Sequence, residues 1–193
     1  MPPRVKYSRD AVISAAVNVV RKGGLSALNA RSIAAELGCS TQPLYSVLGN
    51  MDELRKAVYA EAARRFYHCI ANAPASPGTP PYKASGLALL RFANEERQLY
   101  KLLLLRDRSL EINGLEDPGL SQASDTAYDS IMKATGYSLE TAKAFHGHMF
   151  VYIQGLAAML ASGYLPYDEN RAGRLLTDEY KALRLLYDSE PCE

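Results

Sequence analysis

The sequence predicts an all-α fold. Apolar residues recur at spacings of three and four along most of the chain, and no stretch shows the sustained two-residue alternation of a strand. Proline and glycine clusters separate these periodic segments, and Ser or Asn residues with helix-capping chemistry stand before several of them. A chain of 193 residues suits one ordinary domain or two small ones.

The first two helices are expected near the N-terminus. Ser8 can cap the first helix, and Gly23-Gly24 ends it. Its apolar residues have helical spacing: Ile13, Ala16, Val17 and Val20. A short second helix over 30–37 follows Asn29, a good N-cap, and ends at Gly38, which can take the positive φ of a sharp turn.

A third short helix is expected after this turn, with Ser40 or Thr41 as its cap. Pro43 lies in its first turn, where a missing N–H costs little. Leu44, Val47 and Leu48 are spaced i, i+3 and i+4, so their side chains are expected to face the core. Segment 29–48 therefore has the pattern of a helix-turn-helix, the motif that places a helix in the major groove of DNA. Small helix pairs joined by glycine also occur in all-α proteins that never touch DNA.

The outward side chains of the third helix suit base and phosphate contacts. Gln42 can hydrogen-bond an adenine edge in bidentate fashion, and Thr41 or Pro43 can pack on a thymine methyl group. The Tyr45 hydroxyl suits a phosphate oxygen. Charge is distributed unevenly along the chain: residues 1–65 hold ten Lys and Arg against five acids (+5), and the remainder holds twelve against sixteen (−4). A basic N-terminal part is modest support for a nucleic-acid partner, because no run of like charge is longer than two.

The first part of the chain resembles the DNA-binding domain of the TetR-like (TetR/AcrR) family of bacterial transcriptional regulators. The matching residues are the run Ile33-Ala34-Ala35-Glu36-Leu37-Gly38, Ser40, the pair Leu44-Tyr45, and Leu54. The resemblance implies a three-helix DNA-binding domain over 6–66, whose helix-turn-helix is 29–48. A longer helix, opened by Asn50 or Asp52 and reaching about Ala71, joins it to a helical ligand-binding and dimerisation domain over 80–189. The expected DNA contacts are Arg31, Ser40, Thr41, Gln42, Pro43, Tyr45, Ser46 and Asn50.

One part of the family pattern is absent. Members typically carry a His-Phe pair after the Leu-Tyr pair and then a Lys at the start of the next helix. Here these places hold Val47, Leu48 and Met51. Leu48 keeps the apolar anchor, but Val47 and Met51 remove polar groups that such proteins direct at phosphates.

The remaining elements are delimited by proline, glycine and serine. Residues 73–81 form a stiff linker with four prolines. The expected elements after it are helices over 82–94 and 95–108, a loop over 112–120, a helix from Ser121 or Ser124 to Thr135, a long helix from Ser138 to about Ser162, and a last helix over 169–188.

The helix after Ser138 carries two apolar stripes. The first is Leu139, Ala142, His146, Met149, Ile153, Leu156 and Leu160, and the second is Phe145, His148, Tyr152, Gly155 and Met159. We expect one stripe to pack on the body and the other, with the last helix, on a second subunit. The resemblance likewise implies a homodimer through the last two helices. A wholly intramolecular core is the alternative.

The resemblance also implies an effector pocket, for a small apolar or aromatic molecule. Candidate lining residues are Phe92, Tyr100, Leu103, Phe145, His148, Met149 and Tyr152. Each of them also suits an ordinary core. No metal or cofactor is expected, because His146 and His148 point to different helix faces.

The sequence thus predicts a ligand-responsive DNA-binding regulator, a repressor by family analogy, that binds a palindromic operator as a dimer. The alternative is an all-α ligand- or protein-binding module with weakened DNA binding. An enzyme is not expected, because the sequence has no phosphate-binding glycine loop, nucleophile motif or catalytic cluster. Three cysteines without paired spacing (Cys39, Cys69 and Cys192) and no signal peptide favour the cytoplasm, and the longest apolar stretch, 149–161, is too short to span a membrane.

Overall fold

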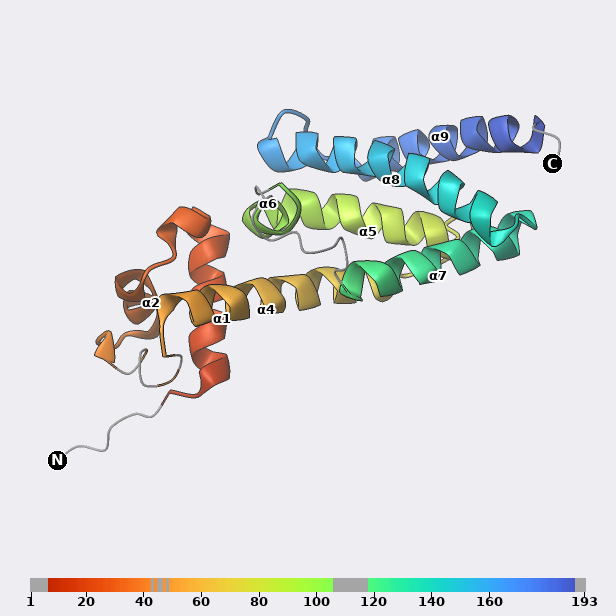
Figure 1. Ribbon diagram of the computed structural model, residues 1–193. Helices are drawn as coiled ribbons and strands as arrows, with labels where there is room; N and C mark the ends of the chain where they lie inside the picture. The colour runs from red at the N-terminus through yellow and green to blue at the C-terminus, as the bar shows by residue number, and fades with distance from the viewer. Residues whose placement is uncertain (1–6, 43, 45–46, 48, 106–117, 190–193) are drawn as a thin grey trace. The chain divides into compact units, whose positions relative to one another are not determined.

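The computed structural model describes residues 7–42, 44, 47, 49–105 and 118–189, with the backbone alone at 118–123. Its elements are α1 (Arg9–Gly23), the short 3-10 helix η1 (Leu25–Ala27), α2 (Ala30–Leu37), α4 (Met51–Ala71), α5 (Pro81–Glu95), α6 (Arg97–Leu104), α7 (Pro118–Thr135), α8 (Leu139–Ser162) and α9 (Glu169–Ser189) (Figure 1). Within these described ranges the backbone forms no strand, and an isolated bridge joins Ser76 to Thr79. The predicted all-α fold is confirmed.

The chain packs as two compact units. The first contains the described residues of Met1–Arg65 and Glu96–Asp107, and the second contains those of Phe66–Glu95 and Arg108–Glu193. The division falls inside α4, and α6 belongs with the N-terminal helices although its sequence lies within 80–189. The domain limits expected from the sequence, 6–66 and 80–189, stay a prediction.

The core of the first unit forms where α1 packs on α2 and α6. Its most buried large side chains are Val12, Val17, Val20, Ile33, Leu99 and Tyr100. The Arg21 guanidinium donates to both carboxylate oxygens of Glu96, with Nε 2.6 Å from Oε2. This ion pair links the end of α1 to the residue that precedes α6.

Capping residues fix several helix boundaries where the sequence predicts them. The hydroxyl oxygens of Ser8 and Ser138 each accept from the backbone N–H three residues on, at 3.2 Å, and open α1 and α8. Asn29 Oδ1 accepts from Ser32 N at 3.0 Å and opens α2. Gly38 ends α2 in the left-handed region, with φ 67° and ψ 34°. These side chains satisfy backbone groups that a helix end leaves unpaired.

Two predicted boundaries are wrong. Helix α7 begins at Pro118, inside the predicted loop over 112–120 and before Ser121 or Ser124. Proline is favoured in the first turn of a helix because its fixed φ suits the helix and its missing N–H would have no partner there. Helix α6 ends at Leu104, before the predicted end at 108, and residues 106–117 lie outside the described part of the chain.

The second unit consists of α5, α7, α8, α9 and the end of α4. Helix α5 packs on α8, α9 and α7, and α8 also packs on α7 and α9 (Figure 1). Buried side chains at these contacts include Leu87, Leu90, Ile131, Phe145, Met149, Ile153, Leu176 and Leu183. Gly86 allows a close approach, because a Cβ atom there would lie 3.1 Å from Leu176 Cδ1 and 3.3 Å from Ile153 Cδ1.

The two stripes of α8 have different surroundings. In the first, Ala142, Met149, Ile153 and Leu160 are buried, while Leu139 in the first turn is exposed. In the second, Phe145 is buried but His148, Gly155 and Met159 are exposed. The first stripe therefore packs inside the unit, and most of the second faces outward. None of the described helices combines the length and apolar character needed to cross a membrane.

Candidate functional site

The second helix of the helix-turn-helix segment has one buried side and one exposed side. After the Gly38 turn, the described residues Gln42, Leu44 and Val47 are helical, and Leu44 N donates to Thr41 O at 3.2 Å. Leu44 is buried, with 4% of its surface exposed, whereas Gln42 is exposed. Leu44 therefore fixes the helix to the first unit, and Gln42 remains open to a partner.

The other expected DNA contacts divide into two groups. Arg31, Ser40 and Thr41 are described: Arg31 and Ser40 are exposed, and Thr41 is half-buried. Pro43, Tyr45 and Ser46 lie outside the described residues, as does Leu48. The predicted roles of all these residues stay predictions.

Asn50, one of the two residues that the sequence offers as the start of the long helix, is its N-cap. Its Oδ1 accepts hydrogen bonds from Asp52 N at 3.0 Å and Glu53 N at 2.9 Å, so Asn50 is the cap of α4. The residue is exposed, and its amide nitrogen is not used in these two bonds. Asn50 can therefore cap the helix and still offer a donor to a phosphate.

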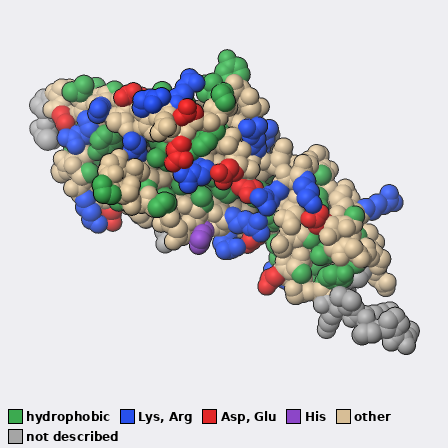
Figure 2. All heavy atoms as spheres, turned by 180° about the vertical axis from the view of Figure 1, so that it is seen from behind, with side chains coloured by type: hydrophobic (Ala, Val, Ile, Leu, Met, Phe, Trp, Pro, Cys, Tyr) green, Lys and Arg blue, Asp and Glu red, His purple; other side chains and the backbone are tan. Residues whose placement is uncertain are grey.

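Most basic side chains described in the first unit are neutralised locally. Ion pairs hold Arg21 to Glu96, Lys22 to Glu36, Arg55 to Asp52, Lys56 to Glu53, and both Arg64 and Arg65 to Glu61. Among the described cations of this unit, Arg9, Arg31 and Lys101 have no ion pair with the described residues. On the face of the molecule in Figure 2, Lys and Arg side chains alternate with Asp and Glu rather than forming one continuous basic area.

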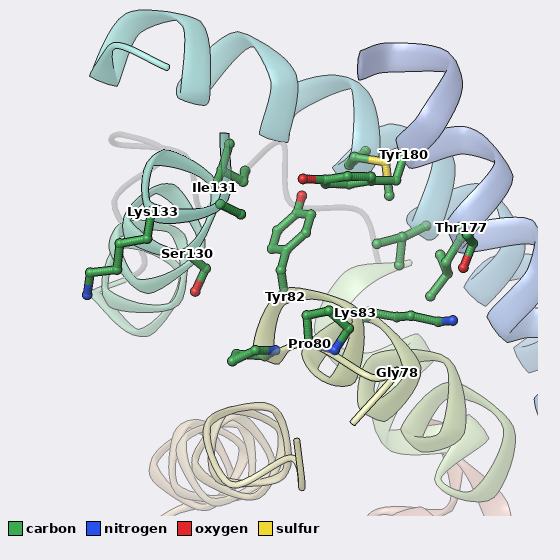
Figure 3. Close-up of a pocket in the computed structure, with 15 residues that line it drawn as sticks. Gly78, Pro80, Tyr82, Lys83, Ser130, Ile131, Lys133, Thr177 and Tyr180 are labelled. Carbon is green, nitrogen blue, oxygen red and sulfur yellow. The ribbon is translucent and has the colours of Figure 1, made fainter. Parts of the chain in front are cut away.

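The second unit contains a partly open cavity of about 660 Å³. It lies among α5, α7, α8, α9 and the segment before α5 (Figure 3). The lining residues are Gly78, Pro80, Pro81, Tyr82, Lys83, Gly86, Ser130, Ile131, Lys133, Ala134, Met149, Ile153, Leu176, Thr177 and Tyr180. This volume is typical of pockets for small organic ligands.

A tyrosine and a histidine form a polar pair at this cavity. The Tyr82 hydroxyl lies 2.9 Å from His146 Nδ1, and either group can be the donor. The His146 ring also contacts the Tyr128 ring edge-on, with centroids 5.4 Å apart. Burial raises the pKa of Tyr82 and lowers the pKa of His146, so the neutral form of each is favoured. In Figure 3 the Tyr82 ring stands in the middle of the site, and its hydroxyl points toward that of Tyr180.

The seven residues expected to line an effector pocket are not brought together. Met149 lines the cavity. Phe145 is fully buried between the Tyr180 and Tyr187 rings, and Phe92 packs on Phe66 at 5.2 Å. The others lie elsewhere: Tyr100 and Leu103 are buried in the first unit, His148 is exposed, and Tyr152 is half-buried outside the lining. Their roles in ligand binding remain predictions.

Sequence reasoning missed Tyr82 and Tyr180, the two aromatic residues that line the cavity. Tyr82 follows the proline-rich segment at the start of α5, and Tyr180 lies on the amphipathic α9. The sequence places both residues on predicted helices. Their meeting depends on the packing of α5 against α9, for which the sequence holds no local signal.

The outward face of α8 and α9 is unusually apolar. Val151 and Leu185 expose 73% and 76% of their surface, and Met159 and Leu186 are exposed too. Gly147 and Gly155 lie on the same face of α8, where an added Cβ atom would meet nothing within 4 Å. A face of this kind suits a second copy that approaches closely, as the expected dimer requires.

The fold closely matches several solved structures. A TetR-like transcriptional regulator from Rhodococcus sp. RHA1 aligns with 97% of this chain and 98% of its own, at a TM-score of 0.69 and 21% identity. A TetR-family member from Streptomyces coelicolor aligns over 89% and 96%, at a TM-score of 0.58 and 22% identity. This chain has a TetR-like fold.

The multidrug binding protein EbrR, solved in complex with imidazole, shares this TetR-like fold with 21% identity and a TM-score of 0.56 over 93% of this chain and 97% of its own. Comparison with family models and with curated proteins gives no match. The likeness therefore establishes the fold, and function has to be argued from the residues.

Proposed function

We propose that this chain is a DNA-binding transcriptional regulator, a repressor that binds a palindromic operator as a homodimer and responds to a small-molecule effector. The observation that carries the proposal is the helix-turn-helix of the TetR-like fold. Leu44 fixes its second helix in the core, and Gln42 remains exposed near the start of that helix. Helices in this arrangement read bases with their N-terminal residues.

The proposed DNA contacts divide by chemistry. Gln42 reads a base edge, helped by Thr41 and Pro43, while Tyr45, Ser40, Ser46, Asn50 and Arg31 contact the backbone or nearby groups. Arg31 is supported by its exposure and by the absence of an ion pair with the described residues. One helix contacts too few bases for a specific site, so a dimer that reads two half-sites about 34–36 Å apart is required.

Selection from a fragment library followed by footprinting tests this proposal. We expect the purified protein to protect an imperfect inverted repeat. Gln42→Ala should relax the preference at one or two base pairs, at a cost of about 1–3 kcal/mol, and Tyr45→Phe should weaken all sequences alike. Protection of unrelated, non-symmetric fragments would contradict the proposed operator, and intact affinity in both variants would contradict the proposed docking.

A second candidate is a ligand- or protein-binding module with weakened DNA binding. It is favoured by the ion pairs that neutralise most described cations of the first unit, and by the apolar residues Val47 and Met51. The salt dependence of affinity separates the two candidates. An operator binder loses affinity steeply as salt rises, because each phosphate contact releases counterions. A shallow dependence, with no sequence preference, would favour the second candidate.

The effector site that we propose is the cavity lined by Tyr82 and Tyr180. Its volume of about 660 Å³ suits a small organic molecule, and its lining is mostly apolar. The similarly folded EbrR is a multidrug binding protein, which supports ligand binding within this fold. A thermal-shift screen of small apolar compounds tests it: a ligand that binds the folded state raises the melting temperature. Filling the cavity with Ile153→Trp should abolish such shifts.

A further inference from the structure

The charged residues of the cavity are all of one sign. Its fifteen lining residues include Lys83 and Lys133 and contain no Asp or Glu. Lys83 comes from α5 and Lys133 from α7, so two separate helices supply the positive charge. Neither lysine forms an ion pair with any residue that the structure describes. A ligand that enters the cavity therefore passes lysine side chains and meets no compensating carboxylate in the lining.

The two ammonium groups lie at the rim of the cavity. In Figure 3 the nitrogen atoms of Lys83 and Lys133 are at the outer ends of their side chains, directed away from Tyr82 in the middle. Lys83 is half-buried and Lys133 is exposed. Long lysine side chains commonly place their aliphatic part along an apolar wall and keep the charge in water. Their stems here line the wall, and their charges can meet a ligand group that stays near solvent.

The interior suits a hydrocarbon rather than a second polar group. Ile131, Met149, Ile153 and Leu176 supply its apolar surface, and all four side chains are buried. The Tyr82 hydroxyl already has a partner in His146. The interior surface is therefore mostly hydrocarbon, with the Tyr82 and Tyr180 hydroxyls as its polar points.

We propose that the cavity selects apolar carboxylic acids, with the hydrocarbon body among Ile131, Ile153 and Leu176 and the carboxylate at the rim beside Lys83 or Lys133. This inference rests on the proposed function only in treating the cavity as the effector site. A matched amine is disfavoured, because its charge at the rim would lie beside an ammonium group and find no carboxylate in the lining. A matched alcohol keeps the apolar contacts and loses the charged ones.

The charge preference is tested with three ligands that share one hydrocarbon body and carry an acid, an alcohol or an amine head group. Isothermal titration calorimetry and thermal shift of the full-length protein, without DNA, would compare phenylbutyrate, phenylbutanol and phenylbutylamine. A second series would probe a longer, stiffer body with three biphenyl compounds: biphenylcarboxylate, biphenylmethanol and biphenylmethylamine. We expect the acid of at least one series to bind about tenfold more tightly than its alcohol, and the amine to bind most weakly. The preference should shrink as salt rises, because the rim is exposed to solvent.

Lysine variants locate the preference in the cavity. Lys83→Met with Lys133→Met keeps most of each aliphatic stem, so alcohol binding should be unchanged and the acid should lose its advantage. Lys181→Met is the matched control, because Lys181 is exposed on α9 and does not line the cavity. An acid preference that survives in the double variant, an amine that binds as tightly as the acid, or the absence of binding in both series would each overturn the inference.

Operator binding is measured separately, so the two proposals fail separately. Acid binding that leaves DNA binding unchanged would support the ligand class and contradict the proposed effector role. Loss of the acid preference, with a specific operator found by footprinting, would overturn the ligand class and leave the DNA-binding proposal standing.

Discussion

At the scale of single residues, the half-buried pair of Tyr82 and His146 makes the stability of the fold depend on pH. The two side chains lie 2.9 Å apart, and burial lowers the pKa of His146 from its ordinary value of 6.5. The unfolded chain therefore takes up a proton on this imidazole before the folded protein does. The contribution of His146 to stability is complete above about pH 6.5 and is lost as the pH falls below it.

His146→Gln tests this pH dependence. The amide can keep a hydrogen bond with Tyr82 and does not titrate. We expect the free energy of unfolding in urea to decrease less in the variant than in the native protein between about pH 8 and about pH 5.5. The comparison uses the difference between the two pH values, because the substitution also changes the ring contacts of His146. Equal decreases in the two proteins would contradict the assigned role of burial.

Arg31 is the second residue whose environment gives a prediction. It is exposed and unpaired among the described residues, whereas Arg55 is held by Asp52 at 3.0 Å. Arg31→Gln should therefore weaken binding to all DNA sequences and reduce the slope of log affinity against log salt by about 1. Arg55→Gln removes the same charge from an existing ion pair and should change the slope less. Equal slopes in both variants would show that Arg31 does not contact a phosphate.

At the scale of elements, the start of α4 combines a helix cap with a predicted DNA contact. Asn50 Oδ1 accepts the N–H groups of Asp52 and Glu53, which leaves the amide nitrogen for a phosphate. The same residue therefore contributes to stability through its oxygen and, in the proposed docking, to affinity through its nitrogen.

Two substitutions separate these contributions. Asn50→Asp keeps a capping oxygen and should preserve the melting temperature, but it replaces the donor with a negative charge and should weaken DNA binding. Asn50→Ala removes both groups and should cost about 1 kcal/mol of stability as well. Thermal unfolding and DNA titration of both variants give the two readouts. Full DNA affinity in Asn50→Asp would remove Asn50 from the interface.

Helix starts with a capping side chain are the boundaries that the sequence predicts best. Ser8, Asn29 and Ser138 act on backbone groups within three residues, so local sequence is sufficient to identify them. Pro118 falls in a predicted loop but begins α7, because proline ends a helix as readily as it begins one. The lining of the cavity was mostly missed, because Tyr82 and Tyr180 come together only through the packing of α5 on α9.

At the scale of the whole molecule, the outward face of α8 and α9 decides whether one chain can act alone. Val151 and Leu185 are largely exposed, and Gly147 and Gly155 leave a shallow backbone surface on α8. Exposed apolar groups in one chain are stabilised when a second chain covers them. The proposed reading of two half-sites depends on this association.

Gly155→Gln tests the proposed dimer face without disturbing the monomer. A Cβ atom there meets nothing within 4 Å, and replacing a helical glycine stabilises an isolated helix by about 0.5–1 kcal/mol. We expect sedimentation to show weaker dimers, with unchanged helical content and weaker operator binding. Tyr164→Gln removes a side chain that is 78% exposed beyond the end of α8 and should leave the dimer intact. Full dimerisation in Gly155→Gln would place the interface elsewhere.

The missing side chain at Gly86 also has a consequence for how effectors of different length are distinguished. Leu176 and Ile153, which a methyl group at this position would crowd at 3.1 and 3.3 Å, are both walls of the cavity. Gly86 lines the cavity as well, so Gly86→Ala would add a methyl group to the lining and force Leu176 and Ile153 to shift. The lack of a side chain at position 86 therefore leaves room for a ligand, and a single added carbon atom should favour smaller effectors.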